Sequence, residues 1–145
     1  MIDGRFEGNV HVLPIRVYYE DTDLSGVVYH ANYLRFMERG RSEFFRAVNI
    51  PLAYLNEAEP AAWTLRKVTV EFIRPARLED VVEVRTVPAT LTGVRLSADQ
   101  SVYCGDVLLM KGWVEACIMT TAGKPRRIPR DVRDKLLPFL GKTEA

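Results

Sequence analysis

The chain has 145 residues, of which 48% are hydrophobic and 27% are charged, an ordinary composition for a globular domain. Its 20 basic and 19 acidic side chains leave a net charge of +1, which argues against a dedicated nucleic-acid-binding protein and against a disordered chain. No apolar run approaches the roughly 20 residues of a membrane span, and the N-terminus lacks the apolar stretch of a secretory signal.

The predicted single domain covers residues 1–145, with a core at about residues 10–138 and a cytoplasmic location, and it begins with a strand. An apolar, β-branched run from Val10 to Tyr19 predicts that strand, and a polar turn over Glu20–Gly26 follows it. Apolar residues then recur at helical spacing and predict an amphipathic helix over about His30–Val48.

The predicted helix contains a glycine, Gly40, in its middle. Glycine costs about 1 kcal/mol relative to alanine there, so we expect the helix backbone to lie close to a sheet at this point. The connector after the helix, residues 50–62, contains Pro51 and Pro60 and leaves room for one short helix.

The second half of the chain has the period of two that is typical of strands. Shorter strands are predicted around residues 68–73 and 81–85, and longer ones over about Val94–Cys104 and Val107–Met119. Gly123 and Pro125 then end the sheet, Arg130–Leu140 predicts a short terminal helix, and Gly141–Ala145 predicts a frayed tail. One helix with four or five mostly antiparallel strands predicts an α+β domain, and a long curved sheet can wrap such a helix.

The two cysteines, Cys104 and Cys117, and the two histidines are too few and too dispersed for a structural zinc site. A two-residue hairpin loop at residues 105–106 pairs Cys104 with Val107 and Cys117 with Val94. The two thiols then lie far apart along the hairpin, whereas a disulfide needs Cα atoms within about 7 Å of each other. We therefore expect both cysteines to be reduced.

Chemistry-bearing residues concentrate between the first strand and the helix, where Glu20, Asp21 and Asp23 precede Gly26 and His30. One interpretation is an acidic turn that only caps the helix. A calcium loop of the EF-hand type is excluded, because its twelfth position holds Asn32 in place of the bidentate glutamate and a strand precedes it. A third interpretation is catalytic. A carboxylate beside the free N–H groups of a helix N-terminus can attack a carbonyl, or activate water, while those groups stabilise the oxyanion.

A set of residues here resembles the signature of the 4-hydroxybenzoyl-CoA thioesterase family, and is most similar to its branch of small bacterial acyl-CoA thioesterases, the YbgC type. These residues are Arg16-Val17, Thr22-Asp23, Gly26-Val27-Val28, His30 and Tyr33. Two weaker matches, Phe72–Asp80 and Gly123–Pro129, extend the resemblance to about residues 12–135.

The resemblance implies a hotdog fold, in which a long curved antiparallel sheet wraps one central helix. It implies homodimers that join their sheets, often paired into homotetramers, with active sites at the dimer interface. It also implies hydrolysis of acyl-CoA thioesters, with short-chain or aromatic acyl groups, without a metal or other cofactor, coenzyme A being part of the substrate. Asp23 stands at the position of the catalytic carboxylate, as nucleophile or general base, and the N–H of His30 stands where the carbonyl is polarised.

The neighbouring residues are candidates for substrate contact. The His30 side chain has three possible roles, which are to contact substrate, to act as an acid or only to pack. Tyr29 and Tyr33 have two, which are to contact substrate or only to pack. Asn32 either caps the helix, which we favour, or binds substrate. For the phosphates of coenzyme A, or for an acidic acyl carrier protein as a second candidate partner, the basic candidates are Arg74, Arg77, Lys124, Arg126 and Arg127.

Two further functions stay open at this point. A hotdog dehydratase or hydratase acting on hydroxyacyl thioesters resembles a different pattern, with a catalytic histidine beside an acidic residue inside the helix. Here His30 precedes the helix core and Asp23 lies in the loop, which favours hydrolysis. A protein that binds acyl-CoA or an acyl carrier without turnover is the other possibility, and the presence of Asp23 argues against it.

Overall fold

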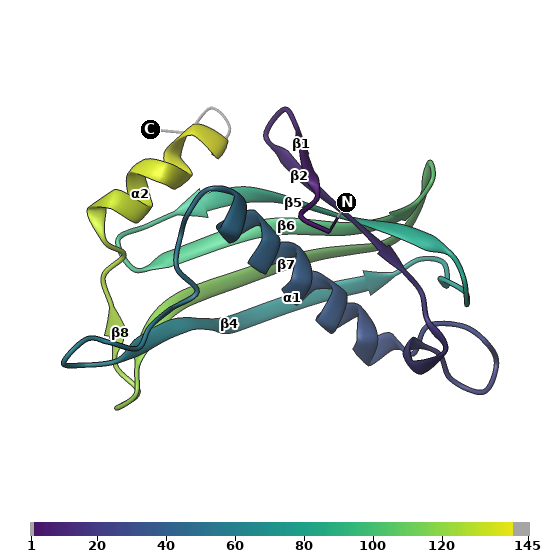
Figure 1. The fold of residues 1–145 in the computed structure, drawn as a ribbon, viewed down its shortest axis with the longest axis horizontal. Coiled ribbons are helices and arrows are strands. Elements are labelled where there is room, and N and C mark those ends of the chain that lie inside the picture. The colour runs from purple at the N-terminus through teal and green to yellow at the C-terminus, as the bar shows by residue number, and fades with distance from the viewer. Residues whose placement is uncertain (1, 141–145) are drawn as a thin grey trace.

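The computed structural model describes residues 2–140, in which a long antiparallel sheet curls around one helix (Figure 1). The strands are β1 (Arg5–Glu7), β2 (Val10–Arg16), β3 (Ala53–Tyr54), β4 (Ala61–Phe72), β5 (Val81–Leu91), β6 (Arg95–Cys104), β7 (Val107–Thr120) and β8 (Pro125–Arg126). The helices are α1 (His30–Ala47) and α2 (Arg130–Leu136), with short 3-10 helices at Tyr19–Asp21 and Leu137–Phe139. None of the helices within residues 2–140 is long and apolar enough to cross a membrane.

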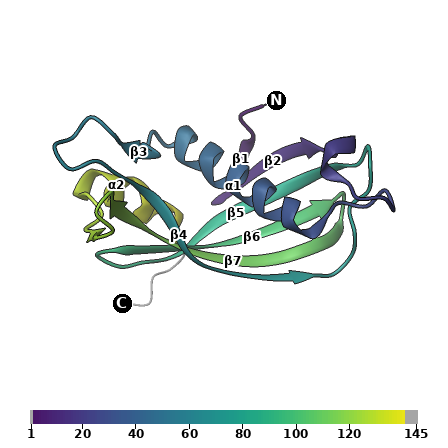
Figure 2. The same ribbon diagram turned by 90° about the horizontal axis from the view of Figure 1, so that it is seen from below.

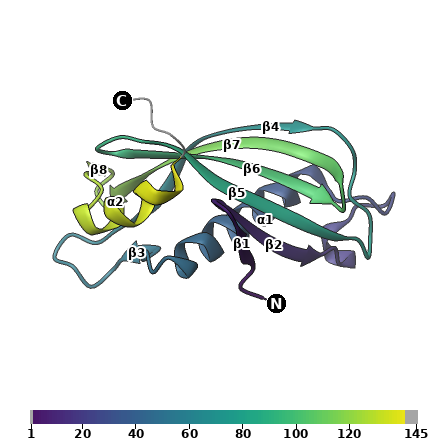
Figure 3. The ribbon, with the colours of Figure 1, turned by 90° about the horizontal axis from the view of Figure 1, so that it is seen from above.

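The strand order is β1-β2-β5-β6-β7-β4-β3, with every pair antiparallel, and β8 pairs with the far end of β7. The five long strands of this sheet confirm the predicted strands, while β1, β3 and β8 are two or three residues long and were not predicted. Figures 2 and 3 show α1 lying along the concave face, with α2 and β8 together at one end of the sheet. The α+β class is confirmed.

Helix α1 buries the predicted apolar stripe against the sheet, including Tyr33, Phe36, Met37 and Phe44. Gly40 is buried with them, and a Cβ atom built on it would lie 2.7 Å from Cγ1 of Val84. The expected close approach of the helix backbone to the sheet is therefore confirmed, and the absence of a side chain at Gly40 sets how near α1 lies to β5.

The first strand is shorter than predicted, because β2 ends at Arg16 and Tyr19 enters a 3-10 helix. The backbone N–H of Tyr18 donates to Oδ2 of Asp21 at 2.9 Å, so a side chain takes it out of the strand ladder. The N–H of Val17 still donates to the carbonyl of Asp80, the residue before β5, at 2.8 Å. The pairing of β2 with β5 therefore continues for one residue beyond the two strands. The chain turns here toward the acidic loop.

The hairpin between β6 and β7 has the predicted loop, and Cys104 faces Val107 as expected. A bulge at Leu109 then shifts the register by one residue, so Cys117 faces Arg95, and the predicted pairing with Val94 is wrong. The carbonyl of Leu109 accepts hydrogen bonds from the N–H groups of Ile73 and Arg74 at 2.8 and 3.1 Å, which draws it out of the regular ladder. Both cysteines are free, as predicted.

The connector after α1 contains the short strand β3 and no helix within its described residues, so the room that the sequence left for a short helix is not used. The hydrogen bond from the N–H of Trp63 to the carbonyl of Leu52, at 3.2 Å, ties this connector to β4 as an extra strand. The terminal helix is confirmed by α2 and the 3-10 helix after it. The predicted frayed tail, residues 141–145, lies outside the described residues.

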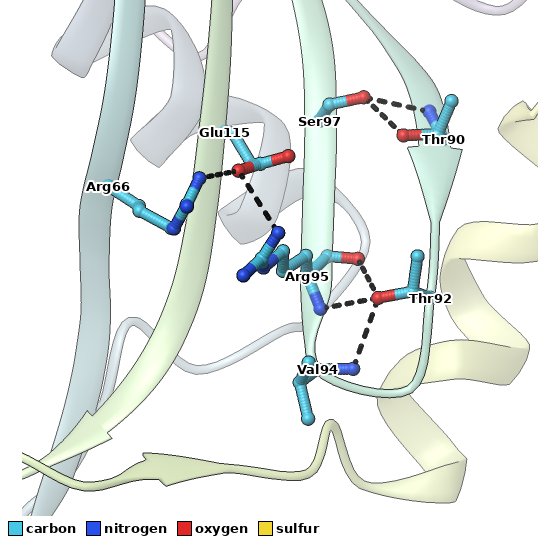
Figure 4. A network of polar contacts seen from close by, with 7 residues as sticks. All are labelled: Arg66, Thr90, Thr92, Val94, Arg95, Ser97 and Glu115. Atoms are coloured by element: carbon cyan, nitrogen blue, oxygen red, sulfur yellow. Dashed lines mark hydrogen bonds and ion pairs between the residues drawn. The ribbon is translucent and has the colours of Figure 1, made fainter.

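The face of the sheet away from α1 carries a network of cross-strand polar contacts (Figure 4). Glu115 of β7 accepts a hydrogen bond from Arg66 of β4 and lies 4.0 Å from Arg95 of β6. Arg66 is the extra residue of a bulge in β4, between Leu65 and Lys67. The network holds this bulge against β7, and the side chains that alternate with Glu115 point to the concave face under α1.

Candidate active site

Asp23 lies in the loop that joins β2 to α1, seven residues before the first residue of the helix. The loop folds back on itself through a bridge between Thr22 and Val28, and the N–H of Asp23 donates to the carbonyl of Val27 at 3.0 Å. Gly26 adopts a φ of 79°, which permits the tight turn. The eight residues from Asp23 to His30 therefore form a closed, ordered loop.

The Asp23 carboxylate is exposed, and one of its oxygens is held by a neighbour. Oδ1 accepts hydrogen bonds from the Ser25 hydroxyl at 2.6 Å and from the Ser25 backbone N–H at 2.9 Å. These bonds, the hydroxyl first, lower the pKa of Asp23 below its ordinary value. Within residues 2–140, Oδ2 has no hydrogen-bond donor, so this oxygen is available to a reacting molecule.

The sequence analysis missed Ser25 as a partner of Asp23. The signal was present, since an aspartate followed two residues later by a serine is typical of an Asx turn.

The loop is anchored to the segment after β4. The N–H of Val28 donates to the carbonyl of Ala76 at 2.8 Å, and the N–H of Leu78 donates to the carbonyl of Gly26 at 3.1 Å. The Tyr33 hydroxyl accepts a hydrogen bond from the N–H of Ala76 at 2.9 Å, and its side chain is buried. Tyr33 therefore positions the anchor of the loop with its hydroxyl.

Asp21 and Asn32 form a second anchor, between the 3-10 helix and α1. The Asn32 amide donates to Oδ1 of Asp21 at 2.7 Å, and the N–H of Tyr29 donates to the Asp21 carbonyl at 3.0 Å. Asp21 is buried. The expected capping role of Asn32 is wrong, because the residue at the N-cap is Tyr29 and no side chain caps the helix. The pair instead fixes the direction in which the loop enters α1.

His30 is the first residue of α1, so its N–H has no acceptor within the helix, whereas the N–H of Asn32 donates to the carbonyl of Tyr29 at 2.8 Å. Its ring stacks on Tyr29, with centroids 4.5 Å apart, and lies 5.9 Å from the ring of Phe72 at the end of β4. His30 and Tyr33 line a pocket of about 300 Å³ with Phe72 and Arg74. The structure thus brings His30, Tyr33 and Arg74 together in one pocket, with Tyr29 stacked on His30, while Asp23 lies on the loop that leads to them.

Two of the predicted basic residues lie elsewhere. Lys124 precedes β8 and Arg126 is part of it, at the opposite end of the sheet from the start of α1 (Figure 1). Arg126 forms an ion pair with Glu57 at 2.7 Å, and its guanidinium lies 5.1 Å from the ring of Tyr54. Within one protomer, neither residue reaches the site around Asp23.

The donor set around Asp23 does not form a metal centre in the described part of the chain. Residues 2–140 contain no group of three or more His, Cys, Asp or Glu side chains arranged to hold a metal ion. What the site does present is an ionised carboxylate beside the positive end of an 18-residue helix. That arrangement can stabilise a negative charge developing on a carbonyl oxygen.

Comparison with known proteins places the chain in a family. The family model of the thioesterase superfamily matches residues 25–115. The acyl-CoA thioesterase YbgC of Haemophilus influenzae is 34% identical over 134 residues, covering 92% of this chain and 95% of the relative. The acyl-CoA thioester hydrolase YbgC of Escherichia coli O6:H1 is 39% identical over 121 residues, covering 82% of this chain and 90% of the relative.

The fold agrees with this match. The crystal structure of a probable thioesterase from Bartonella henselae superposes with a TM-score of 0.79 at 40% identity, covering 83% of this chain and 98% of that one. The sheet that curls around α1 is the hotdog fold implied by the resemblance. By its fold and by the family match over residues 25–115, the chain belongs to the thioesterase superfamily.

Proposed function

We propose that the protein hydrolyses acyl-CoA thioesters to a free acid and CoA, with Asp23 as the catalytic carboxylate. The observation that carries this proposal is the placement of Asp23, an exposed carboxylate with a lowered pKa, on an ordered loop that leads directly into the N-terminus of α1. The family match begins at residue 25, so the role of Asp23 rests on this geometry and on the signature around it.

The thioester carbonyl oxygen binds at the N–H of His30, in the first turn of α1. The unpaired N–H groups and the helix dipole there stabilise the oxyanion that forms when the carbonyl carbon is attacked. The ring of His30 and the side chains of Tyr29, Tyr33 and Asn32 surround this position. The main contribution of Tyr33 and Asn32 is to fix the loop, through their hydrogen bonds to Ala76 and Asp21 respectively.

Two routes use the same Asp23 carboxylate. In the nucleophilic route, an Asp23 oxygen bonds to the carbonyl carbon, the C–S bond breaks, CoA leaves as a thiolate, and water then cleaves the mixed anhydride. In the general-base route, Asp23 takes a proton from water as the water oxygen attacks, and that proton passes to the departing thiolate. Neither route calls for a metal or another cofactor.

The proposed homodimer forms through the outer edge of β4. Strand β3 covers only Ala61 and Ala62, so within the described residues β4 has no strand partner on that side from Thr64 to Phe72. An exposed edge of this length invites another strand. Two copies that pair these edges antiparallel, centred on Val68, form a continuous sheet and bring Phe72 close to Trp63 of the partner subunit, because the extra residue of the bulge, Arg66, does not count in the pairing.

This dimer completes the site. Helix α1 runs antiparallel to β4, since His30 lies beside Phe72 and Phe45 lies beside Trp63, with ring centroids 5.9 and 5.1 Å apart. Pairing the β4 edges therefore brings the start of α1 in one subunit toward the β3 and β8 end of the other. Lys124 and Arg126 of that subunit, with Arg74 of the first, then supply positive charge for the phosphates of CoA.

The test is release of free thiol from acyl-CoAs ranging from acetyl to palmitoyl, with benzoyl and 4-hydroxybenzoyl, and from the same acyl groups on an acyl carrier protein. Hydrolysis of the CoA esters supports the proposal, and the best acyl group gives the substrate class. If only the esters of the acyl carrier protein are hydrolysed, the substrate is an acyl carrier protein ester and not an acyl-CoA.

The other functions give different results in the same assay. Loss of water from a hydroxyacyl-CoA without release of thiol indicates a dehydratase. Tight binding of acyl-CoA with no turnover of any ester indicates a binding protein. Either outcome overturns the proposed function.

A further inference from the structure

A second cavity lies on the concave face of the sheet beneath the C-terminal half of α1. Its volume is about 280 Å³, and its walls are mainly apolar, with Phe44 and Phe45 from α1, Trp63 from β4, and Leu96, Ala98 and Val114 from β6 and β7. A cavity of about 150 Å³ is large enough to bind benzene. This one therefore has room for a substituted aromatic ring or a short acyl chain.

Two charged side chains lie in this mainly apolar lining, the anionic Glu38 and the cationic Arg41. Arg41 follows Gly40 on α1, on the face that also carries Met37 and Phe44 and packs on the sheet. Its Nη1 donates to Oε1 of Gln100 at 3.0 Å. Gln100 is fully buried and fixed in turn, because its Nε2 donates to the Met37 carbonyl and to the Thr86 hydroxyl, both at 2.9 Å.

The Arg41 guanidinium has no ion-pair partner in the described part of the chain. No carboxylate of residues 2–140 lies within 4.0 Å of it. Burial lowers the pKa of Arg41, and the more distant charge of Glu38 opposes that effect. A guanidinium has five N–H donors, and those of Arg41 that do not bond to Gln100 are not closed off in the fold. An oxygen of a bound molecule can accept hydrogen bonds from them.

Trp63, Thr64 and Leu65 of β4, at its outer edge, line the cavity. In the dimer described above, Trp63 lies close to the partner's Phe72, which lies beside the partner's His30. The thioester carbonyl at the partner's helix N-terminus is then next to this side of the cavity. Gln100 lies on β6, two strand spacings or about 10 Å inward from β4, so an acyl group entering here extends toward Arg41.

We propose that Arg41 is a specificity-determining residue that selects acyl groups carrying an oxygen acceptor at the end remote from the thioester. This inference rests on the proposed thioesterase function and names its substrate class. The acceptor is a carboxylate, as in a dicarboxylic acid monothioester, or a phenolic hydroxyl, as in a hydroxybenzoyl group. Both offer an oxygen to the guanidinium, and the experiment separates them.

The first measurement compares kcat/KM for two matched pairs of substrates, glutaryl-CoA against valeryl-CoA and 4-hydroxybenzoyl-CoA against benzoyl-CoA. Each pair differs only in the terminal oxygen group. The wild-type enzyme prefers the oxygenated member of at least one pair by about tenfold or more, because a site built to pair a buried polar group rejects the analogue that lacks it. The pair with the larger preference identifies the acceptor. No preference in either pair overturns the proposal.

Variants then assign the preference to Arg41. Arg41→Met removes the donors and keeps an apolar side chain, so kcat/KM for the oxygenated substrate falls to the level of its matched partner. Arg41→Lys keeps the charge and part of the preference for a carboxylate. Arg46→Met, on the exposed side of the same helix, leaves the preference unchanged. Equal losses on both members of a pair in Arg41→Met, with a normal melting temperature, contradict the assignment.

Subunit exchange tests whether the cavity serves the partner's Asp23. Asp23→Asn and Arg41→Met proteins are assayed alone and after mixing, with the preferred oxygenated substrate. A mixed dimer holds one site with an intact Asp23 and an intact Arg41 only if these come from different subunits. Random exchange then restores about one quarter of the wild-type sites. No recovery, with exchange confirmed by mass, places both residues in one subunit's site and overturns the proposed route into the cavity.

Binding separates this inference from the proposed function. Calorimetry on the Asp23→Asn protein compares the dissociation constants of glutaryl-CoA, valeryl-CoA and the two benzoyl esters. If no thioester is hydrolysed but the oxygenated esters bind about tenfold more tightly, the catalytic proposal fails while the assignment of Arg41 stands. If esters are hydrolysed and the matched pairs bind and react equally, only the assignment of Arg41 fails.

Discussion

The hydroxyl of Ser25 donates to Oδ1 of Asp23 at 2.6 Å, and the Ser25 N–H donates to the same oxygen at 2.9 Å. Both bonds favour the ionised carboxylate, and the hydroxyl contributes most to the lowered pKa of Asp23. Because the ionised form is the active one in either proposed route, the acidic limb of the pH–rate profile lies at low pH.

Ser25→Ala removes the hydroxyl and keeps the backbone bond, so we expect the acidic limb of kcat/KM to move to higher pH while activity at neutral pH is largely kept. The measurement is kcat/KM for one acyl-CoA across the acidic range in both proteins. Thr22→Ser, in the same loop, keeps its hydroxyl and serves as the control. An unchanged limb in Ser25→Ala contradicts the proposed link between Ser25 and the reacting carboxylate.

Gly40→Ala is predicted to destabilise the fold, although alanine is the better helix former. The new Cβ would lie 2.7 Å from Cγ1 of Val84 and 3.0 Å from Oγ1 of Thr86, so α1 must move away from the sheet. Overpacking of this kind costs about 1–3 kcal/mol of unfolding free energy, measured by urea denaturation. Arg39→Ala, exposed on the same helix, stays within about 0.5 kcal/mol of wild type. A stabilised Gly40→Ala protein contradicts the close approach.

The proposed β4 pairing predicts how a charge introduced at Thr69 changes the stability of the dimer. With the pair centred on Val68, Thr69 faces the partner's Lys67 on the sheet. Thr69→Lys places like charges opposite each other twice per dimer and weakens the dimer by about 0.5–2 kcal/mol, whereas Thr69→Glu strengthens it. Sedimentation at several protein concentrations and salt concentrations measures both. Equal dissociation constants for the two variants contradict this register.

His11 makes stability depend on pH. Its ring is fully buried, with Nε2 3.0 Å from the Asp3 carbonyl, and burial lowers its pKa below the ordinary value of 6.5. Below pH 6.5 the unfolded chain takes up a proton that the folded chain resists, so stability is full above that pH and falls as pH decreases. We expect His11→Phe to flatten the fall in unfolding free energy between neutral and mildly acidic pH. The same slope in both proteins contradicts this account.

Local patterns in the sequence predicted α1, the long strands and the grouping of Asp23 with His30. These features depend on residues close together in the chain, since the loop and the helix start are seven residues apart. The Asx turn at Ser25 was equally local but was not predicted, because the interpretation of the loop concerned its acidic residues and not the serine beside them.

Long-range contacts decided what the sequence did not predict. The bulge at Leu109 exists because its carbonyl serves the N–H groups of Ile73 and Arg74, more than thirty residues away in the chain. The contact of Arg41 with Gln100 joins residues 59 positions apart. The two-residue alternation of a strand indicates which face of the sheet a side chain occupies, but not which distant group that side chain contacts.

The catalytic role of Asp23 is tested most directly by thiol release from the best acyl-CoA, with wild type and Asp23→Asn assayed side by side before and after treatment with a chelator. Asparagine keeps the shape of the side chain but cannot act as a carboxylate. We predict that kcat/KM falls by about 10²–10⁴ in Asp23→Asn and that wild-type activity survives the chelator. Equal activity in the two proteins would contradict the role of Asp23, and wild-type activity abolished by the chelator would contradict a metal-independent site.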